Sequence, residues 1–304
     1  MIRASLIMSQ IDIFKISGGL GNQLFQIAAA SNFSFQHETT VYLNISSCQL
    51  SQVREQRFSC EDLIRHININ RTKIRLLPGP QRLVALAEKA LRREYLQRLL
   101  GEHVCIEYEK QPYTFHPIPA RKLALNLYKG YWQSEKYFSK LPISFASLVS
   151  SYLDSQVLVT MPKISSELLP KVAVHVRRGD YKNLTCYGLL SNDYYEAAIA
   201  HIKEKIGDCI VVIFSDEIDK ISEEYKGKAS ILFNDLGMTP IEVLGYMASC
   251  DHFITANSSF SWWAAYLGRN PSKIVVTPKR WFRDREKTPD LIPERWVEID
   301  NQHI

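Results

Sequence analysis

The sequence predicts an α/β fold, and three observations lead to it. The 304 residues are enough for two domains of ordinary size, each with its own core. After residue 171, short β-branched runs alternate with helical segments, which is typical of a doubly wound parallel sheet. Near the N-terminus a strand, a glycine-rich loop and a helix follow one another, which is the layout of a ligand-binding turn.

The glycine-rich loop at 17–23, SGGLGNQ, joins a predicted strand at 11–16 to a predicted helix at 24–33. Backbone N–H groups at the start of such a helix have no partner within the helix and can bind a polar ligand. The neutral amides of Asn22 and Gln23 suit sugar hydroxyls or phosphate oxygens. The alternative is a tight turn that only packs the helix on the strand.

Two departures separate this loop from a dinucleotide site. The fingerprint needs a third glycine three residues after Gly21, where Leu24 stands. It also needs an acidic residue after the next predicted strand, at 40–43, where Asn44 stands. The sequence therefore argues against a nicotinamide-dependent oxidoreductase.

A basic helix is predicted at 81–100, after a helix near 60–66 and a Pro-Gly-Pro break at 78–80. Such a helix either packs on the protein with a solvated polar face or lies on an anionic membrane. Its apolar stripe consists of Leu83, Leu86, Ala87, Ala90 and Leu91, and its basic side of Arg82, Lys89, Arg92, Arg93 and Arg98.

The stretch at 128–138, YKGYWQSEKYF, places amides and a carboxylate between aromatic rings. It suits a sugar, which offers C–H faces and hydroxyls, and it suits core packing equally well. Polar and proline residues become frequent between 150 and 170, so we predict a boundary there, with domains at 1–160 and 161–304.

The second domain is predicted to alternate strands with helices, and it begins with the buried strand in KVAVHVRRGDY at 171–181. We expect strands at 172–176, 209–214, 230–233, 252–255 and 273–277, and helices at 193–206, 240–248 and 260–267.

Polar residues follow three of these strands, at 175–180, 215–217 and 257–259. Ligands of open α/β sheets bind outside the carboxyl ends of the strands. Two hydroxyls, on Ser258 and Ser259, stand at the start of a predicted helix, which is a geometry that suits phosphate. The sequence therefore predicts a nucleotide site at this edge of the sheet.

Arg177 and Arg178 are expected to point to opposite sides of their strand. One would then bind the ligand and the other a structural partner, for which Asp180 is a candidate. Asp216 could accept from a purine amino group or a ribose hydroxyl. A surface cluster of ion pairs is the alternative explanation for this group of charges.

Composition and charge indicate an ordinary soluble protein. The net charge of +5 is too modest to indicate nucleic-acid binding. No N-terminal signal segment or membrane span is recognisable, and translation could start at Met1 or Met8. We expect a cytoplasmic protein with reduced thiols, in loose association with the inner membrane face if the basic helix binds lipid. The six cysteines are Cys48, Cys60, Cys105, Cys186, Cys209 and Cys250.

Five motifs between residues 17 and 268 combine into a specific pattern: SGGLGNQLFQIA, GYWQSEKYF, HVRRGDY, FSDE and NSSFSWWAAYLG. In this order they resemble bacterial α-1,2-fucosyltransferases of glycosyltransferase family 11, from which Ile27 departs, where an aromatic residue is frequent. The resemblance implies a GT-B-like arrangement of two Rossmann-like domains facing each other across a cleft. GDP-fucose would bind the C-terminal domain, and a galactoside mainly the N-terminal one.

The resemblance also implies roles for single residues. Arg177 and Asn22 would be the catalytic residues. Arg177 would contact the ribose and pyrophosphate, and Asn22 would face the same cleft from the other domain. No Asp-X-Asp motif is present, so we expect no metal site and no cofactor besides the donor substrate GDP-fucose. The donor-binding residues would be His175, Arg177, Asp216, Ser258, Ser259 and Phe260, with His175 and Asp216 at the guanine.

The implied chemistry is a single displacement with inversion. A galactose 2-hydroxyl would attack the anomeric carbon while GDP leaves, and Arg177 with the helix start at Ser258 would stabilise the growing negative charge. Glu135 and Asp180 both remain candidates for the general base.

Three alternatives stay open at this point. A related fucosyltransferase could use another acceptor hydroxyl, the chain could be an oxidoreductase, or it could bind nucleotides or nucleic acid without catalysis. The acceptor could be free lactose, a lipid-linked O-antigen repeat or a lipooligosaccharide terminus, and the oligomeric state is open.

Overall fold

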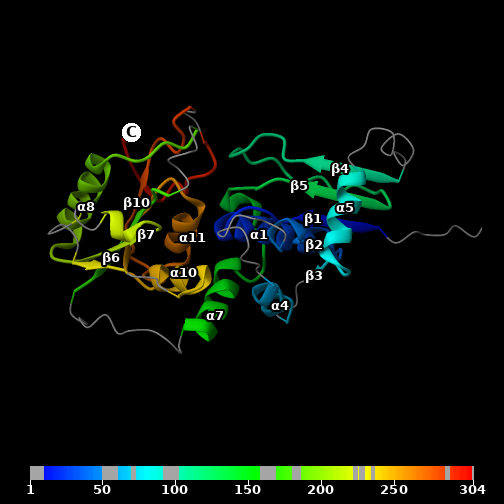
Figure 1. The fold of residues 1–304 in the computed structure, drawn as a ribbon, viewed down its shortest axis with the longest axis horizontal. Coiled ribbons are helices and arrows are strands. Elements are labelled where there is room, and N and C mark those ends of the chain that lie inside the picture. Colours follow the sequence, from blue (N-terminus) through cyan, green and yellow to red (C-terminus); the bar gives the residue numbers. More distant parts are fainter. Residues whose placement is uncertain are drawn as a thin grey trace, which may run out of the picture. The chain divides into compact units, whose positions relative to one another are not determined.

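The computed structural model shows two compact units, residues 1–145 and 146–304 (Figure 1). The predicted boundary lay some fifteen residues further on, and helix α7 (Phe145–Val157) goes with the second unit. The structure describes residues 10–49, 61–69, 73–91, 103–157, 169–179, 186–221, 225, 230–233, 237–284 and 288–302.

The first unit has a five-stranded sheet in the order β3-β2-β1-β5-β4, and every neighbouring pair is parallel. β1 alternates along its length, so Phe14 faces the core and stacks on Tyr128 of β5 at 4.7 Å between ring centroids. The strands are β1 (Ile11–Lys15), β2 (Val41–Asn44), β3 (Ile74–Leu76), β4 (Val104–Tyr108) and β5 (Leu125–Lys129). The helices are α1 (Leu20–His37), α2 (Ser46–Gln49), α4 (Glu61–Ile69), α5 (Gln81–Leu91) and the 3₁₀ helix η1 (Glu135–Tyr137).

The second unit has a six-stranded sheet, again parallel throughout, in the order β11-β10-β9-β6-β7-β8. Counted from β6, this is the 3-2-1-4-5-6 order of a dinucleotide-binding fold. Its strands are β6 (Lys171–Val176), β7 (Ile210–Ser215), β8 (Ile231–Leu232), β9 (His252–Ile254), β10 (Val275–Pro278) and β11 (Val297–Ile299). Its further helices are α8 (Asn192–Ile206), α9 (Ile218–Ile221), α10 (Pro240–Ala248) and α11 (Ser259–Leu267).

Aromatic packing accounts for the tryptophan pair of the NSSFSWW motif. Trp262 and Trp263 on α11 are fully buried, and Trp262 stacks on Tyr266 with ring centroids 4.8 Å apart. Their role is therefore structural. The predicted α/β fold with two Rossmann-like domains is confirmed.

The basic helix α5 differs from its prediction. Leu83 and Leu86 were expected to form the apolar stripe, but each is 61% exposed. Glu88 is the residue that faces inward, at 6% exposure. The lysines that bind this carboxylate belong to β1 and β5. The periodicity of the helix sequence alone could therefore not predict which face of the helix turns inward. Arg92, Arg93 and Arg98 lie outside the described residues.

Candidate functional site

The carboxyl edge of the second sheet brings together the three polar segments that the sequence singled out. β6 pairs with β7 on one side and β9 on the other, so the residues after these three strands share one edge. The strand order reverses between β6 and β9. Open α/β sheets bind ligands at such a switch point, because the helices that follow the two strands lie on opposite faces and leave a crevice.

The two adjacent arginines do separate, as the strand geometry predicts. Arg178 is 7% exposed and donates to the Leu190 carbonyl at 3.0 Å and to Asn192 Oδ1 at 3.3 Å. Arg177 keeps 18% of its side chain exposed and forms an ion pair with Asp216 over 3.1 Å. Arg178 therefore stabilises the fold, and Arg177 is partly exposed at the carboxyl edge of the sheet. Asp180 lies outside the described residues.

Asp216 organises the loop after β6. Its Oδ1 accepts from the backbone N–H of Arg178 and its Oδ2 from that of Gly179, each at 3.0 Å, besides the ion pair with Arg177. A Cβ at Gly179 would lie 2.5 Å from Asp216 Oδ2, so this close approach requires glycine. In the structure this carboxylate fixes the loop and orients Arg177, and its contact with a donor base or ribose stays a prediction.

His175 is buried at this edge, with 5% exposure, and its ring lies 5.9 Å from that of Phe260. Burial, with the nearby Arg177 guanidinium adding to it, lowers the pKa of His175 to about 3. Within the described part of the chain, Nδ1 of this imidazole has no hydrogen-bond partner. A neutral imidazole with an unused nitrogen can exchange a hydrogen bond with a ligand at neutral pH.

The start of α11 completes the edge. Ser258 is the N-cap, and its Oγ accepts from the Phe260 N–H at 3.3 Å. The first turn, with Ser259 at its beginning, contains no acidic residue, so the N-terminal end of the helix dipole is uncompensated there. Sequence reasoning missed the part played by Asn257, whose buried amide donates to three carbonyls and fixes the preceding turn. Those carbonyls belong to Tyr187, Gly188 and Trp281.

In the first unit, side-chain amides fix the glycine-rich loop. Gln133 donates to Asn22 Oδ1 at 2.8 Å. Gln26 accepts from the Ser17 N–H at 2.8 Å and donates to the Gly130 carbonyl at 2.9 Å. The loop at 17–23 is thereby tied to the segment after β5, which joins two of the motifs that were recognised separately.

A buried ionic cluster, Lys15–Glu88–Lys129–Asn44, lies at the carboxyl ends of β1, β2 and β5. Glu88 binds Lys15 at 2.8 Å and Lys129 at 3.1 Å, and it accepts from Asn44 at 3.2 Å. Sequence reasoning missed this cluster. The signal was Glu88, the one acidic residue within 81–91 of the basic helix, together with polar residues at the ends of three strands.

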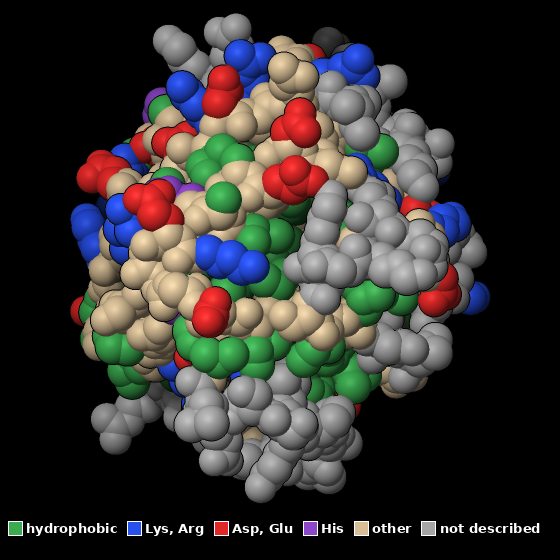
Figure 2. Space-filling model, turned by 90° about the vertical axis from the view of Figure 1, so that its left-hand side faces the viewer, with side chains coloured by type: hydrophobic (Ala, Val, Ile, Leu, Met, Phe, Trp, Pro, Cys, Tyr) green, Lys and Arg blue, Asp and Glu red, His purple; other side chains and the backbone are tan. Residues whose placement is uncertain are grey.

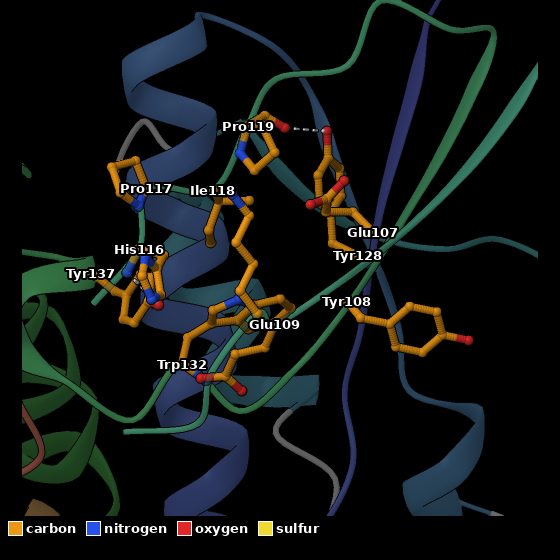
Figure 3. A pocket seen from close by; sticks show the side chains of 11 residues that line it. Glu107, Tyr108, Glu109, His116, Pro117, Ile118, Pro119, Tyr128, Trp132 and Tyr137 are labelled. Carbon is orange, nitrogen blue, oxygen red and sulfur yellow. Dashed lines mark hydrogen bonds between the residues drawn. The ribbon is translucent and has the colours of Figure 1, made fainter. Parts of the chain in front are cut away.

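A small cavity of about 20 Å³ opens beside β4 and β5, with Trp132 and His116 among its lining residues (Figure 3). It has room for about one water and is too small for a sugar ring. Glu109 at its wall accepts from the N–H groups of Tyr131 and Trp132, and burial raises the pKa of this carboxyl. Of the two candidate bases, Glu135 begins η1 and is half-buried, and Asp180 lies outside the described residues.

Among the residues that the structure describes, thiols and potential metal ligands add no further site. Cys48 and Cys250 are buried, which raises the pKa of each thiol to about 12. In the described ranges, no three His, Cys, Asp or Glu side chains converge as a metal site would require. None of the described helices is long and apolar enough to cross a membrane.

Known proteins similar to this chain are glycosyltransferases. The chain is 27% identical to an Escherichia coli alpha-1,2-colitosyltransferase, over 95% of this chain and 99% of that protein. It is 26% identical to the E. coli O-antigen biosynthesis glycosyltransferase WbnK, over 93% and 99% of the two chains. It is also 26% identical to a Caenorhabditis elegans galactoside 2-alpha-L-fucosyltransferase, over 93% of this chain and 74% of the other.

The family model of glycosyl transferase family 11 matches residues 13–300, which include both sheets and both loops described above. With this match over most of the chain, the protein belongs to glycosyl transferase family 11 and is a fucosyltransferase-like glycosyltransferase.

Proposed function

We propose that the protein transfers L-fucose from GDP-β-L-fucose to the 2-hydroxyl of a terminal galactose, forming an α-1,2 linkage with inversion. One observation carries the proposal. At the switch point of a 3-2-1-4-5-6 sheet, the ring of a neutral His175 lies 5.9 Å from that of Phe260 at the start of α11, and Arg177 follows at the end of the same strand. A guanidinium and an uncompensated helix start suit a diphosphate, and the imidazole suits a base or ribose.

The reaction needs stabilisation of a leaving diphosphate. The galactose oxygen forms a bond to the anomeric carbon as the bond from that carbon to the phosphate oxygen breaks. Negative charge then grows on GDP, and we propose that Arg177 and the N-terminal end of α11 stabilise this charge. The ion pair with Asp216 orients Arg177 before the donor arrives, which lowers the cost of positioning it during the reaction.

The attacking hydroxyl must also lose its proton. We propose that the first unit binds the galactoside with the amides around Asn22, and that Glu135 or Asp180 accepts the proton. Glu135→Gln and Asp180→Asn distinguish the two candidates. The variant that lacks the base should lose about 10²-fold or more in kcat at unchanged GDP affinity. Wild-type kcat in both variants would mean that neither residue is the base.

A second donor is suggested by one of the E. coli relatives, which is named a colitosyltransferase. The name of a second relative, WbnK, suggests an O-antigen acceptor, so lipid-linked and soluble galactosides are both substrates to test. A nucleic-acid partner is not supported. Lys/Arg and Asp/Glu side chains are interspersed on the face shown in Figure 2, and the net charge is only +5.

The deciding experiment incubates the purified protein with GDP-fucose or GDP-colitose and a panel of β-galactosides, with and without EDTA. GDP release and the linkage of the product are followed. EDTA-insensitive fucosyl transfer to a galactose 2-hydroxyl is the expected result. If only colitose is transferred, the proposed donor is wrong but the proposed reaction class stands. If the product has another linkage, the proposed acceptor hydroxyl is wrong. Hydride transfer with a nicotinamide cofactor would overturn the proposal.

A further inference from the structure

Helix α5 exposes the face that its sequence pattern assigned to the core. Leu83 and Leu86 are each 61% exposed, one helical turn apart. The helix is held in this orientation because Glu88, on its opposite side, binds Lys15 and Lys129. Large apolar side chains that stand adjacent on an exposed helix face often mark an interaction surface.

The charges on this face have a single sign. Within Gln81–Leu91, the ionisable residues are Arg82, Glu88 and Lys89. The carboxylate of Glu88 is buried and paired, whereas Arg82 and Lys89 are exposed. Arg82, Leu86 and Lys89 follow one another at spacings of four and three residues, so the cations lie beside the leucines on one side of the helix.

We propose that this face of α5 (Arg82, Leu83, Leu86 and Lys89) docks on a membrane surface that contains acidic phospholipid. A helix with exposed apolar residues and flanking cations binds such a surface with its axis in the interface, without spanning the bilayer. Each cation near an anionic surface contributes about a fivefold gain in binding. Two cations and two leucines therefore give a weak, reversible association.

A second copy of the chain fits this face less well. In a symmetric dimer through the same face, the cations of both copies would lie close together and repel. The area that two leucines and their neighbours can bury is also far smaller than the roughly 800 Å² per partner that a stable interface buries. A membrane supplies both the negative charge and the apolar interior that the face needs.

The docking proposal is independent of the proposed reaction, because vesicle binding is measured without donor or acceptor. The full-length protein is sedimented with vesicles of phosphatidylcholine alone or with one third phosphatidylglycerol. Binding is expected only to the acidic vesicles. Leu83→Ser/Leu86→Ser should lower the partition coefficient on the order of tenfold, and Arg82→Gln or Lys89→Gln about fivefold each. The control is Ile143→Ser, which alters another exposed apolar residue of the first unit and should leave binding unchanged.

Three outcomes would overturn the docking proposal: no binding to acidic vesicles, binding that none of the α5 substitutions weakens, or a dimer in solution that Leu83→Ser/Leu86→Ser dissociates. The substituted side chains are exposed, so thermal unfolding and transfer to a soluble galactoside should match the wild type. These two readouts separate a lost docking surface from a misfolded protein.

Discussion

The two units contain the same kind of switch point and use it differently. In the first sheet the strand order reverses between β1 and β5, and there Lys15 and Lys129 bind the buried Glu88. In the second sheet it reverses between β6 and β9. There Arg177 pairs with a partly exposed Asp216, and Nδ1 of His175 has no hydrogen-bond partner among the residues that the structure describes. Buried charges that satisfy one another fix loops, whereas a partly exposed guanidinium beside a neutral imidazole remains able to bind a ligand.

We propose from this difference that the first edge stabilises the fold and that the second edge binds the donor. If that division holds, substitutions at the first edge should change unfolding, and those around Arg177 should change the rate of transfer. Substitutions of the neighbouring residues Arg177 and Arg178 test the same distinction between a ligand-binding and a structural role.

The largest effect is expected from Arg177→Ala. Loss of the guanidinium should lower kcat for GDP-fucose by about 10²–10³-fold, because the leaving diphosphate loses a preorganised charge. Steady-state kinetics would measure it, with Arg280→Ala as the control at a more exposed arginine of the same unit. A loss below tenfold would remove Arg177 from the proposed mechanism.

Glu88→Gln should destabilise the first unit by about 3 kcal/mol, because two lysine ammonium groups would lose a buried partner. Denaturant unfolding measures the change. Glu107→Gln is the matched control, since its pair with Arg121 is half exposed and should contribute at most about 1 kcal/mol. Equal unfolding curves for the two variants would show that the buried cluster does not stabilise the first unit.

Arg178→Ala should lower the stability of the second unit by about 2–3 kcal/mol, because the buried Leu190 carbonyl would lose a charged donor. The comparison with Arg177→Ala is the sharpest test of the two edges. We expect a lowered melting temperature for Arg178→Ala and a nearly wild-type one for Arg177→Ala. The reverse order would mean that the structural and ligand-facing arginines are exchanged.

The smallest effect concerns pH. The pKa of His175 is lowered from 6.5 to about 3 in the folded chain, so between these values the unfolded chain binds a proton that the folded chain does not. Stability should therefore fall as the pH drops below about 6.5, by about 2 kcal/mol from this residue at pH 5. Burial lowers the pKa of His252 as well, so the test is the difference between the wild type and His175→Gln. Identical pH profiles would contradict the prediction.

Most of the second unit could be predicted from the sequence. Its strands are short β-branched runs between clear helix signals, and α10 matches the predicted bounds because Pro240 and the capping box of Thr239 and Glu242 mark its start. The common edge of three strand ends followed from the alternation of strands and helices alone. In the first unit β3, β4 and β5 were missed, and in the second β11, because their apolar runs are short.

The sequence by itself determined the fold class, the family and the polar segments at the strand ends, because local periodicity and contiguous motifs encode them. The tertiary structure decided what each charge does. Which charged groups stabilise the fold is shown only by contacts between residues far apart in the chain. Examples are Glu88 with Lys15 and Asp216 with the loop after β6. The same contacts turned the leucines of α5 outward, because a buried carboxylate must face its lysine partners.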